Sequence, residues 1–416
     1  MRWIVAQIGA REHYAVPHAF HQLGHLRLFY TEAWCRWGRE LVRMGPGAFR
    51  AYANRYRPEL PGSAVKSFTP SYAAFHLAHF PGHSSTRAAL YRFFVEAGAW
   101  FATRAAEHLS RQTLSPSEDH FFAFNTGALE ALRLLRARGV FTVLDQIDPG
   151  REEERLVALE REKWPGWEDA VDPIPEEYWS RIREEWELAD IVLVNSEWSK
   201  KLLVRQGVPE SKLIVVPLAY ESPPNMRPQG AVNGQLTVLW LGGVNLRKGI
   251  QYLVEAAKCL PKVRFVVGGP IGIREERVRS APENMVFLGR IQRNSSGRLY
   301  EQAHVFVLPT ISDGFAITQL EAMAHGLPVI TTPNCGQVVA DGVDGLIVPA
   351  ANSEALVAAI GRLDANRREL VEMSRRAVEK ASEFHLPKNA EEIEEKVARV
   401  RAQRGSSPVL ASGSTE

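Results

Sequence analysis

The segment 305–330 constrains the fold of this chain more than any other part of the sequence. Its first apolar run, Val305–Leu308, ends at Pro309, which is the pattern of a buried strand that stops at a loop. Its last residues, Leu327–Ile330, predict the beginning of a second strand. The residues between these runs predict a loop and a helix. A strand, a helix and a strand in this order are typical of a parallel sheet.

Predicted strands and helices alternate in the same way along most of the chain. In the first half, the apolar runs Arg2–Ile8, Val140–Leu144 and Ile191–Val194 predict strands, and Ile214–Val216 closes this part. The alternation resumes over about 236–349. It predicts an α/β fold with two doubly wound, Rossmann-like parallel sheets that face each other across a cleft, where ligands usually bind.

Composition suggests where these parts begin and end. Residues 217–235 contain four prolines and are the best candidate for a linker between a domain of residues 1–216 and a domain of residues 236–385. Residues 405–416 are small and polar, which predicts a disordered tail.

Bulk properties exclude several classes of protein. The net charge of +2 implies no strong general attraction to nucleic acid, so no nucleic-acid partner is expected. Cys35, Cys259 and Cys335 are too scattered for a disulfide framework. The sequence shows neither the pattern of a signal peptide nor an apolar run of the roughly 20 residues that a spanning helix needs. We therefore expect a cytoplasmic protein.

Two carboxylates flank the predicted start of the helix in segment 305–330. Asp313 lies in the loop before the helix, and Glu321 lies inside it. The start of a helix exposes unpaired N–H groups and the positive end of the helix dipole, which suit a phosphate group. Acids on either side of such a point are placed for hydroxyl groups, such as those of a sugar and a ribose. The pattern therefore suggests a nucleotide-sugar site.

The chain carries three motifs in order: Val238–Gly249, Val286–Gln292 and Asp313–Gly326. They resemble the motifs of the retaining glycosyltransferases of family 4, also called group 1 transferases. The family usually has two glutamates separated by seven residues, where this chain has Asp313 and Glu321. The family pattern Gly-Arg-Leu-x-x-x-Lys-Gly is matched with Gly243 in the place of the arginine.

This resemblance implies the two-domain GT-B architecture. Residues 236–385 would bind the nucleotide-sugar donor, residues 1–216 would bind the acceptor, and a helix over residues 386–404 would cross back to the first domain. The resemblance also implies transfer of a hexose-type sugar with retention of anomeric configuration, by a front-face displacement in which the departing phosphate takes the acceptor proton. No cofactor besides the donor is expected. Because the sequence has no Asp-x-Asp motif, no metal dependence is expected either.

The resemblance assigns roles to residues of the second domain. Lys248 matches the family lysine on the diphosphate, and Arg247 is expected to supply the cation that Gly243 lacks, although two solvated surface charges would fit the sequence alone. With Asp313, which matches the acid beside the donor sugar, they form the predicted catalytic group. Glu321 matches the residue that binds the ribose hydroxyls. The other predicted donor contacts are Gly242, Gly243, Gly269, Arg290, Ile291, Gly314, Phe315, Ala316 and Ile317. Residues 315–317 would offer backbone N–H groups, so alanine for the usual glycine at residue 316 is expected to matter little.

The first domain offers fewer matches. Gly9 and Ala10 resemble the glycine turn below the donor sugar. After the strand Val140–Leu144 the family often has a histidine, and here Asp145 or Gln146 could take its sugar-positioning role. Four histidines look like metal ligands, but their mixed spacing favours loop and helix surfaces; they are His13, His18, His21 and His25.

The acceptor is left open as a glycan, a lipid-linked or a small molecule. Nine of the ten tryptophans precede residue 200, and most are expected in the core of the first domain. Stacking on sugar rings remains open. So does peripheral contact of this domain with the inner face of a membrane, beside Arg36, Arg39 and Arg43.

Three functions are alternatives to a glycosyltransferase. A catalytically degenerate nucleotide-sugar binding subunit of a glycan-assembly system fits the departures at residues 243, 313 and 145–146. A dinucleotide-dependent oxidoreductase would need Gly-x-Gly-x-x-Gly after a first strand, which neither domain has. A sugar-nucleotide epimerase of similar fold would differ in its product.

Overall fold

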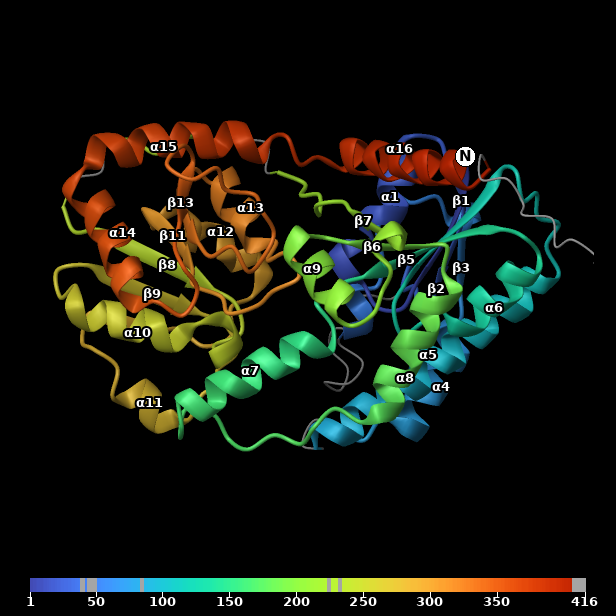
Figure 1. Cartoon of the computed structure of the whole chain (residues 1–416), viewed down its shortest axis with the longest axis horizontal. Helices are drawn as coiled ribbons and strands as arrows, with labels where there is room; N and C mark the ends of the chain where they lie inside the picture. The colour runs from blue at the N-terminus through green and yellow to red at the C-terminus, as the bar shows by residue number, and fades with distance from the viewer. Residues whose placement is uncertain (38–41, 43–50, 83–85, 223–225, 231–233, 406–416) are drawn as a thin grey trace, which may run out of the picture.

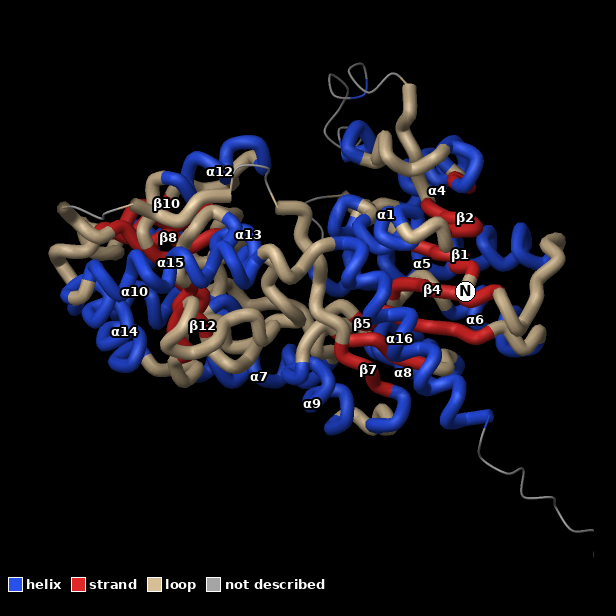
Figure 2. The backbone as a smooth tube through the Cα atoms, turned by 90° about the horizontal axis from the view of Figure 1, so that it is seen from above, coloured by secondary structure: helices blue, strands red, loops and turns tan. Residues whose placement is uncertain are grey.

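The computed structural model describes residues 1–37, 42, 51–82, 86–222, 226–230 and 234–405. Two domains lie side by side along the longest axis (Figure 1). The view from above shows the strands of the two sheets separated, with loops between the domains (Figure 2). Arg39, Arg43, residues 406–416 of the predicted tail, and parts of the predicted linker (223–225 and 231–233) lie outside the described residues.

The N-terminal sheet has seven parallel strands in a doubly wound order. From one edge to the other they are β3 (Val65–Ser67), β2 (Leu26–Thr31), β1 (Arg2–Gln7), β4 (Asp119–Phe124), β5 (Phe141–Gln146), β6 (Ile191–Val194) and β7 (Leu213–Val215). The direction of winding reverses between β1 and β4, which pair with Ile4 opposite Phe121. In such sheets ligands bind outside the carboxyl ends of the strands at this reversal.

The C-terminal sheet has six parallel strands and reverses between β8 and β11. Its order is β10 (Met285–Phe287), β9 (Arg264–Gly268), β8 (Thr237–Leu241), β11 (Val305–Leu308), β12 (Val329–Thr331) and β13 (Gly345–Ile347). The two sheets confirm the predicted α/β fold with two doubly wound parallel sheets.

Helices cover both faces of each sheet, which explains why the strands are apolar throughout rather than alternating. Along β8, Val238 and Trp240 join one buried cluster while Leu239 and Leu241 join the other. The N-terminal domain has α1 (Ala15–Gln22), α4 (Thr69–His79), α5 (Arg87–Ser110), α6 (Leu129–Ala137), α7 (Arg151–Lys163), α8 (Glu176–Leu188) and α9 (Glu197–Arg205). The C-terminal domain has α10 (Ile250–Cys259), α11 (Glu275–Arg279), α12 (Arg293–Glu301), α13 (Thr318–Ala324), α14 (Ser353–Ala365) and α15 (Arg367–Ala381).

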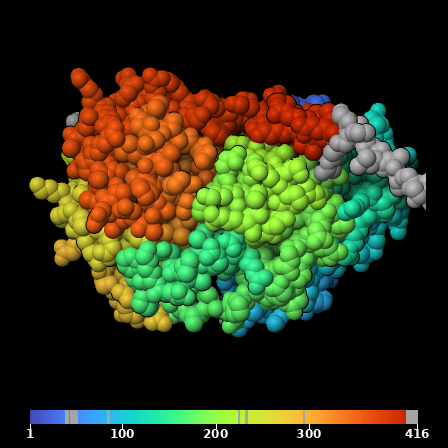
Figure 3. Space-filling view, in the orientation of Figure 1, coloured from blue at the N-terminus to red at the C-terminus, as the bar shows by residue number. Residues whose placement is uncertain are grey.

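Besides the segment between β7 and β8, two segments cross between the domains. The last helix, α16 (Leu386–Gly405), packs on the N-terminal domain, where Ala390 and Ile393 enter a buried cluster and Glu394 accepts a hydrogen bond from Trp3 Nε1 at 2.8 Å. The segment after α7 runs the other way, because Trp167 is buried in the core of the C-terminal domain. The predicted domain of residues 1–216 did not include this excursion. On one face of the molecule, α7 and α9 lie against the C-terminal domain (Figure 3).

No helix within the described part of the chain combines the length and the apolar character that crossing a membrane requires.

Candidate functional site

The candidate site lies where the loop after β11, at the reversal point of the second sheet, meets residues that follow β5 and β6 of the first sheet. Trp198 Nε1, from the N-terminal domain, donates to Ser312 Oγ at 2.9 Å. Beside this bond the backbones nearly touch, since a Cβ added to Gly314 would lie 2.2 Å from the carbonyl oxygen of Ile147. Only glycine fits there, and the loop after β11 is therefore seated directly on the loop after β5.

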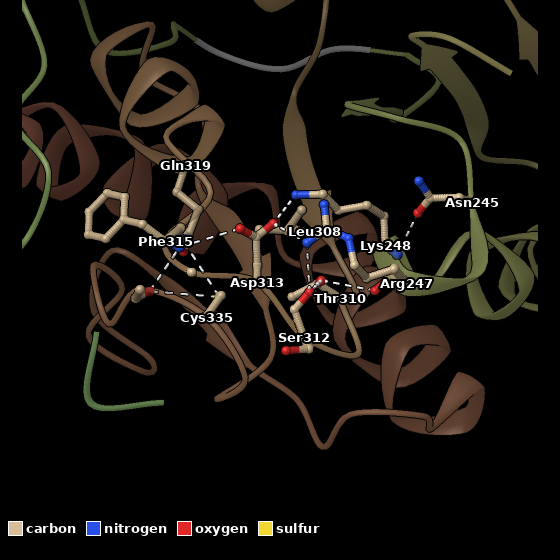
Figure 4. A network of polar contacts seen from close by, with 12 residues as sticks. Asn245, Arg247, Lys248, Leu308, Thr310, Ser312, Asp313, Phe315, Gln319 and Cys335 are labelled. Carbon is tan, nitrogen blue, oxygen red and sulfur yellow. Dashed lines mark hydrogen bonds and ion pairs between the residues drawn. The ribbon is translucent and has the colours of Figure 1, made fainter. Parts of the chain in front are cut away.

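Two cations converge on Asp313 at this junction. They come from the short 3₁₀ helix η5 (Leu246–Lys248), whose Lys248 N–H is capped by Asn245 Oδ1 at 3.0 Å. The Lys248 ammonium contacts the Asp313 carboxylate directly (Figure 4). Arg247 Nη1 lies 3.7 Å from Asp313 Oδ2 and donates to the Ser312 carbonyl oxygen at 3.1 Å. The structure thus brings together the three predicted catalytic residues.

The charge states at this junction depend on burial. Burial of the ammonium group, with Arg247 beside it, lowers the pKa of Lys248 to about 7, while Glu153 acts against this shift. Burial raises the pKa of Glu153, while Arg247, 3.4 Å from its Oε1, acts against that change. Two cationic side chains, Arg247 and Lys248, thus meet two acidic ones, Asp313 and Glu153, at this junction.

The sequence analysis missed two acids that hold these cations in place. Glu153, in the first turn of α7, pairs with Arg247. Glu168, after α7, accepts the Leu246 N–H at 2.7 Å and so fixes the loop that carries Lys248. The only signal for them was a run of acids in a charged helical stretch, which solvated side chains would equally produce.

Residue 316 corrects one expectation. Ala316 has a φ of 64°, in the left-handed region where glycine is favoured and other L-residues are strained. Alanine in place of the family glycine therefore has a consequence, because the backbone keeps the glycine-like conformation and carries the strain.

A cavity of about 270 Å³ in the C-terminal domain is bounded by Glu321. Tyr300 OH donates to Glu321 Oε2 at 2.8 Å, and the Tyr300 ring stacks on His325 with centroids 4.9 Å apart. This contact orients the carboxylate. Predicted residues that also line the cavity are Gly242, Gly269 and Ile291.

The floor of this cavity consists of closely packed backbone. Gly269 has a φ of 144°, and a Cβ there would lie 1.6 Å from the Gly242 carbonyl oxygen, so no other residue fits. Arg290 is exposed and is not among the lining residues, and Gly243 lies beside Asn245.

The N-terminal side of the site begins directly after β1. The Gly9 N–H donates to Glu32 Oε2 at 2.9 Å, and Ala10 precedes the short helix η1 (Arg11–His13). Arg11 and Glu12, which the sequence analysis did not single out, face the end of β5.

The two candidates at the end of β5 differ in their contacts. Gln146 is engaged on one face of the sheet, since it donates to Asp148 Oδ1 at 3.1 Å and accepts from Trp186 Nε1 at 2.9 Å. Asp145 points to the other face, and its buried Oδ1 has no hydrogen-bond partner among the described residues. Burial raises the pKa of Asp145 well above its usual range, and Glu12 adds to this shift.

The histidines at residues 13, 18, 21 and 25 do not form a metal-binding cluster. His25 Nδ1 lies 2.8 Å from Glu394 Oε1, and His18 lies 3.5 Å from Glu221. His18 is a buried residue of α1, so the expectation of a surface position is wrong for this histidine. In the described ranges, no group of three or more His, Cys, Asp or Glu side chains is placed to hold a metal ion.

Known proteins match both the fold and the second domain. The structure is similar to sucrose-phosphate synthase from Thermosynechococcus elongatus (TM-score 0.67, 17% identity, 97% of this chain and 100% of that chain). It is also similar to HepE from Anabaena in complex with UDP (TM-score 0.58, 14% identity, 96% and 100%). Two Rossmann-like domains facing across a cleft define the chain as a protein of the GT-B fold.

The sequence of the second domain matches a known family. Residues 235–366 match the family model described as glycosyl transferases group 1. A D-inositol 3-phosphate glycosyltransferase from Mycobacteroides abscessus is 32% identical over 168 residues, 38% of this chain and 38% of that protein. The second domain thus carries the match to group 1 glycosyltransferases, and the chain as a whole has the GT-B fold. The matched stretches span between 36% and 53% of the length of the curated relatives.

Proposed function

We propose that the chain is a retaining, metal-independent glycosyltransferase that moves a hexose-type sugar from a nucleotide diphosphate-sugar to a hydroxyl group of an acceptor. One observation carries the proposal: Arg247 and Lys248 converge at the contact between the domains, in the same domain as a cavity bounded by Glu321. The two cations would pair with the diphosphate of a nucleotide-sugar, and the Glu321 carboxylate would bind the ribose of the same ligand.

The donor would occupy the C-terminal domain. The diphosphate would take Lys248 and Arg247 as partners, and these preorganised cations would stabilise the charge that develops on the departing phosphate. Glu321, held through one oxygen by Tyr300, would accept hydrogen bonds from the ribose hydroxyls. Asp313 would lie beside the sugar.

The N-terminal domain would hold the sugar from the other side. Burial raises the pKa of Asp145 and so favours the protonated carboxyl group, which can donate a hydrogen bond to a sugar hydroxyl. Asp145 is therefore the better candidate than Gln146 for the positioning role. The acceptor oxygen would bond to the anomeric carbon on the face that the phosphate leaves, and the departing phosphate oxygen would take the proton.

Thermal unfolding with nucleotides tests the donor site. UDP comes first, because HepE was solved with it, followed by GDP and ADP. At a concentration of about 100 times Kd, the matching nucleotide should stabilise the fold by about 2.7 kcal/mol and raise Tm by about 5 °C. Glu321→Ala should lose this shift, while Glu301→Ala, an exposed acid on α12, should keep it. Absence of a shift with every nucleotide would contradict the proposal.

Two further measurements address the finer claims. The coupling constant of the anomeric proton in the product reports retention or inversion. Turnover in the presence of EDTA reports metal dependence, and a complete loss of activity there would refute metal independence.

A nucleotide-sugar binding subunit without turnover is the second candidate. It is favoured by the matched charges at the junction, where Asp313 and Glu153 already neutralise the two cations. A nucleotide-dependent Tm shift without nucleotide release from any donor and acceptor pair would select this function.

A further inference from the structure

Several aromatic side chains of the N-terminal domain line a cavity of about 530 Å³. Helices α4, α5 and α8 build one wall of it, with Tyr72, Phe93, Phe94 and Tyr178 among the lining residues. Cavities of several hundred Å³ with aromatic walls and a few convergent polar groups are typical of small-molecule sites. The cavity lies entirely outside the donor-binding domain.

The aromatic wall is fixed by contacts between its own rings. His76 stacks on Phe80 with centroids 4.7 Å apart, and Phe80 meets Phe93 edge to face at 5.3 Å. Tyr91 meets Tyr178 edge to face at 4.9 Å. Rings held in this way lose little freedom when a ligand binds, so the wall is prepared for an apolar partner.

The polar tips of this wall are largely committed to protein partners. Tyr178 is hydrogen-bonded with Thr126, and Tyr91 with Arg87. Phe93 and Phe94 have no polar atom in their side chains. A ligand along this wall therefore meets ring faces and edges rather than hydrogen-bonding groups.

Polar groups gather at the opposite end of the cavity. Two cations, Arg11 and Arg55, are matched there by two acids, Glu32 and Asp148. Glu32 lies 3.1 Å from Arg55 and accepts the Gly9 N–H, so this end offers no surplus positive charge to an anionic ligand.

This polar end borders the place of transfer. Ile147 and Asp148 line the cavity and are the residues that a Cβ added to Gly314 would meet first. A hydroxyl group at the polar end would thus lie next to the loop that carries Asp313.

We infer that this cavity binds the acceptor, and that the acceptor is a neutral amphipathic molecule whose apolar part, a hydrocarbon chain or an aromatic ring, lies along the aromatic wall. Its hydroxyl group faces the polar end. That oxygen forms the new bond to the anomeric carbon, the bond from this carbon to the phosphate oxygen breaks, and the phosphate oxygen takes the proton. The term acceptor rests on the proposed function, whereas binding of the molecule does not.

Binding of alkyl glucosides to the full chain tests this inference without donor or turnover. Methyl, butyl, hexyl and octyl β-glucosides, each below its micelle concentration, are titrated calorimetrically. Affinity should rise by about fourfold for each buried methylene. Phe94→Asp, at a half-exposed lining residue, should weaken octyl glucoside at least tenfold, and Phe94→Ala less. Leu77→Asp is the matched control, since Leu77 is an exposed apolar residue of α4 outside the cavity.

The outcomes separate this inference from the proposed function. Chain-length dependence that Phe94→Asp removes and Leu77→Asp preserves supports the cavity, even if no nucleotide stabilises the protein. Equal affinity for all four glucosides overturns the inference, as does equal weakening in the two aspartate variants. Tighter binding of maltotriose than of octyl glucoside would also overturn it, because a polar glycan would then be the better ligand.

Discussion

A single methyl group at residue 314 should move the two domains apart at the candidate site. A Cβ built on Gly314 would lie 2.2 Å from the Ile147 carbonyl oxygen, whereas ordinary contacts of this kind begin at 3.4 Å. The backbones must therefore separate by 3.4 − 2.2 = 1.2 Å. The obstructing atoms belong to the main chain and cannot rotate away as a side chain would.

This displacement predicts a selective defect in Gly314→Ala. A misplacement of about 1 Å can lower a rate about 100-fold, and we expect a loss of this size in kcat/KM. Overpacking should also lower the free energy of unfolding by about 1–3 kcal/mol. Nucleotide affinity should stay within about twofold of the wild type, because the cavity bounded by Glu321 is lined only by residues of the C-terminal domain.

The assay is release of nucleotide from the donor that the thermal measurements identify, together with the nucleotide Kd. Gly361→Ala provides the matched control. Gly361 lies in α14, and a Cβ added there would meet no atom of the described residues within 4 Å, apart from the adjacent helix backbone. That variant should gain about 0.5–1 kcal/mol of stability and keep its turnover. Turnover of Gly314→Ala equal to that of the wild type would refute the reasoning, since the contact would then not be part of the productive arrangement.

Four further predictions concern strain, titration, donor binding and the excursion after α7. Ala316→Gly should raise the free energy of unfolding by about 0.5–1 kcal/mol in urea titrations. Ala351→Gly should do the same, because Ala351 has a φ of 57°. A lower free energy of unfolding in both variants would show that neither alanine is strained. Burial raises the pKa of Glu185 from 4.5 to about 7. Its contribution to the free energy of unfolding is therefore full below pH 4.5 and falls by about 3 kcal/mol as pH rises through 7. Unfolding curves of Glu185→Gln, measured across this pH range, should lack this fall in stability. Glu153 should take up a proton when the donor binds. The measured binding enthalpy should then depend on the ionisation enthalpy of the buffer in the wild type, and less so in Glu153→Gln. Trp167→Ala should cost about 3–5 kcal/mol in unfolding of the C-terminal domain, and a cost below 1 kcal/mol would show that the excursion does not belong to that core.

The fold was predictable because parallel strands buried on both faces leave a strong signal. Runs such as Val305–Leu308 are apolar at every position, and the structure shows all four residues buried. The path of the chain after α7 was not predictable. Trp167 is as apolar as any residue of the first domain, and periodicity shows that a side chain is buried without showing which of two cores receives it.

The candidate site was predictable only where a motif carried it. Lys248, Arg247 and Asp313 belong to motifs, and the structure places them in contact. Glu168 acts through a backbone N–H almost 80 positions away in the sequence, which no local pattern reports. The aromatic cavity was missed for a related reason, because side chains such as Phe93 and Phe94 have the spacing of ordinary helix packing. Only the arrangement of three helices shows that they enclose a space.

The paired charges at the contact between the domains explain how this site can be stable without a ligand and still bind a diphosphate. Two cations so close together would repel each other and destabilise the fold, and Asp313 and Glu153 remove that cost. A diphosphate that enters brings negative charge beside these acids, so the site becomes favourable for the ligand only if the acids move away or take up protons. Glu153 is suited to the second route, because burial already raises its pKa toward the protonated form. Protonation would release Arg247 from its ion pair at the moment when the diphosphate needs a cation.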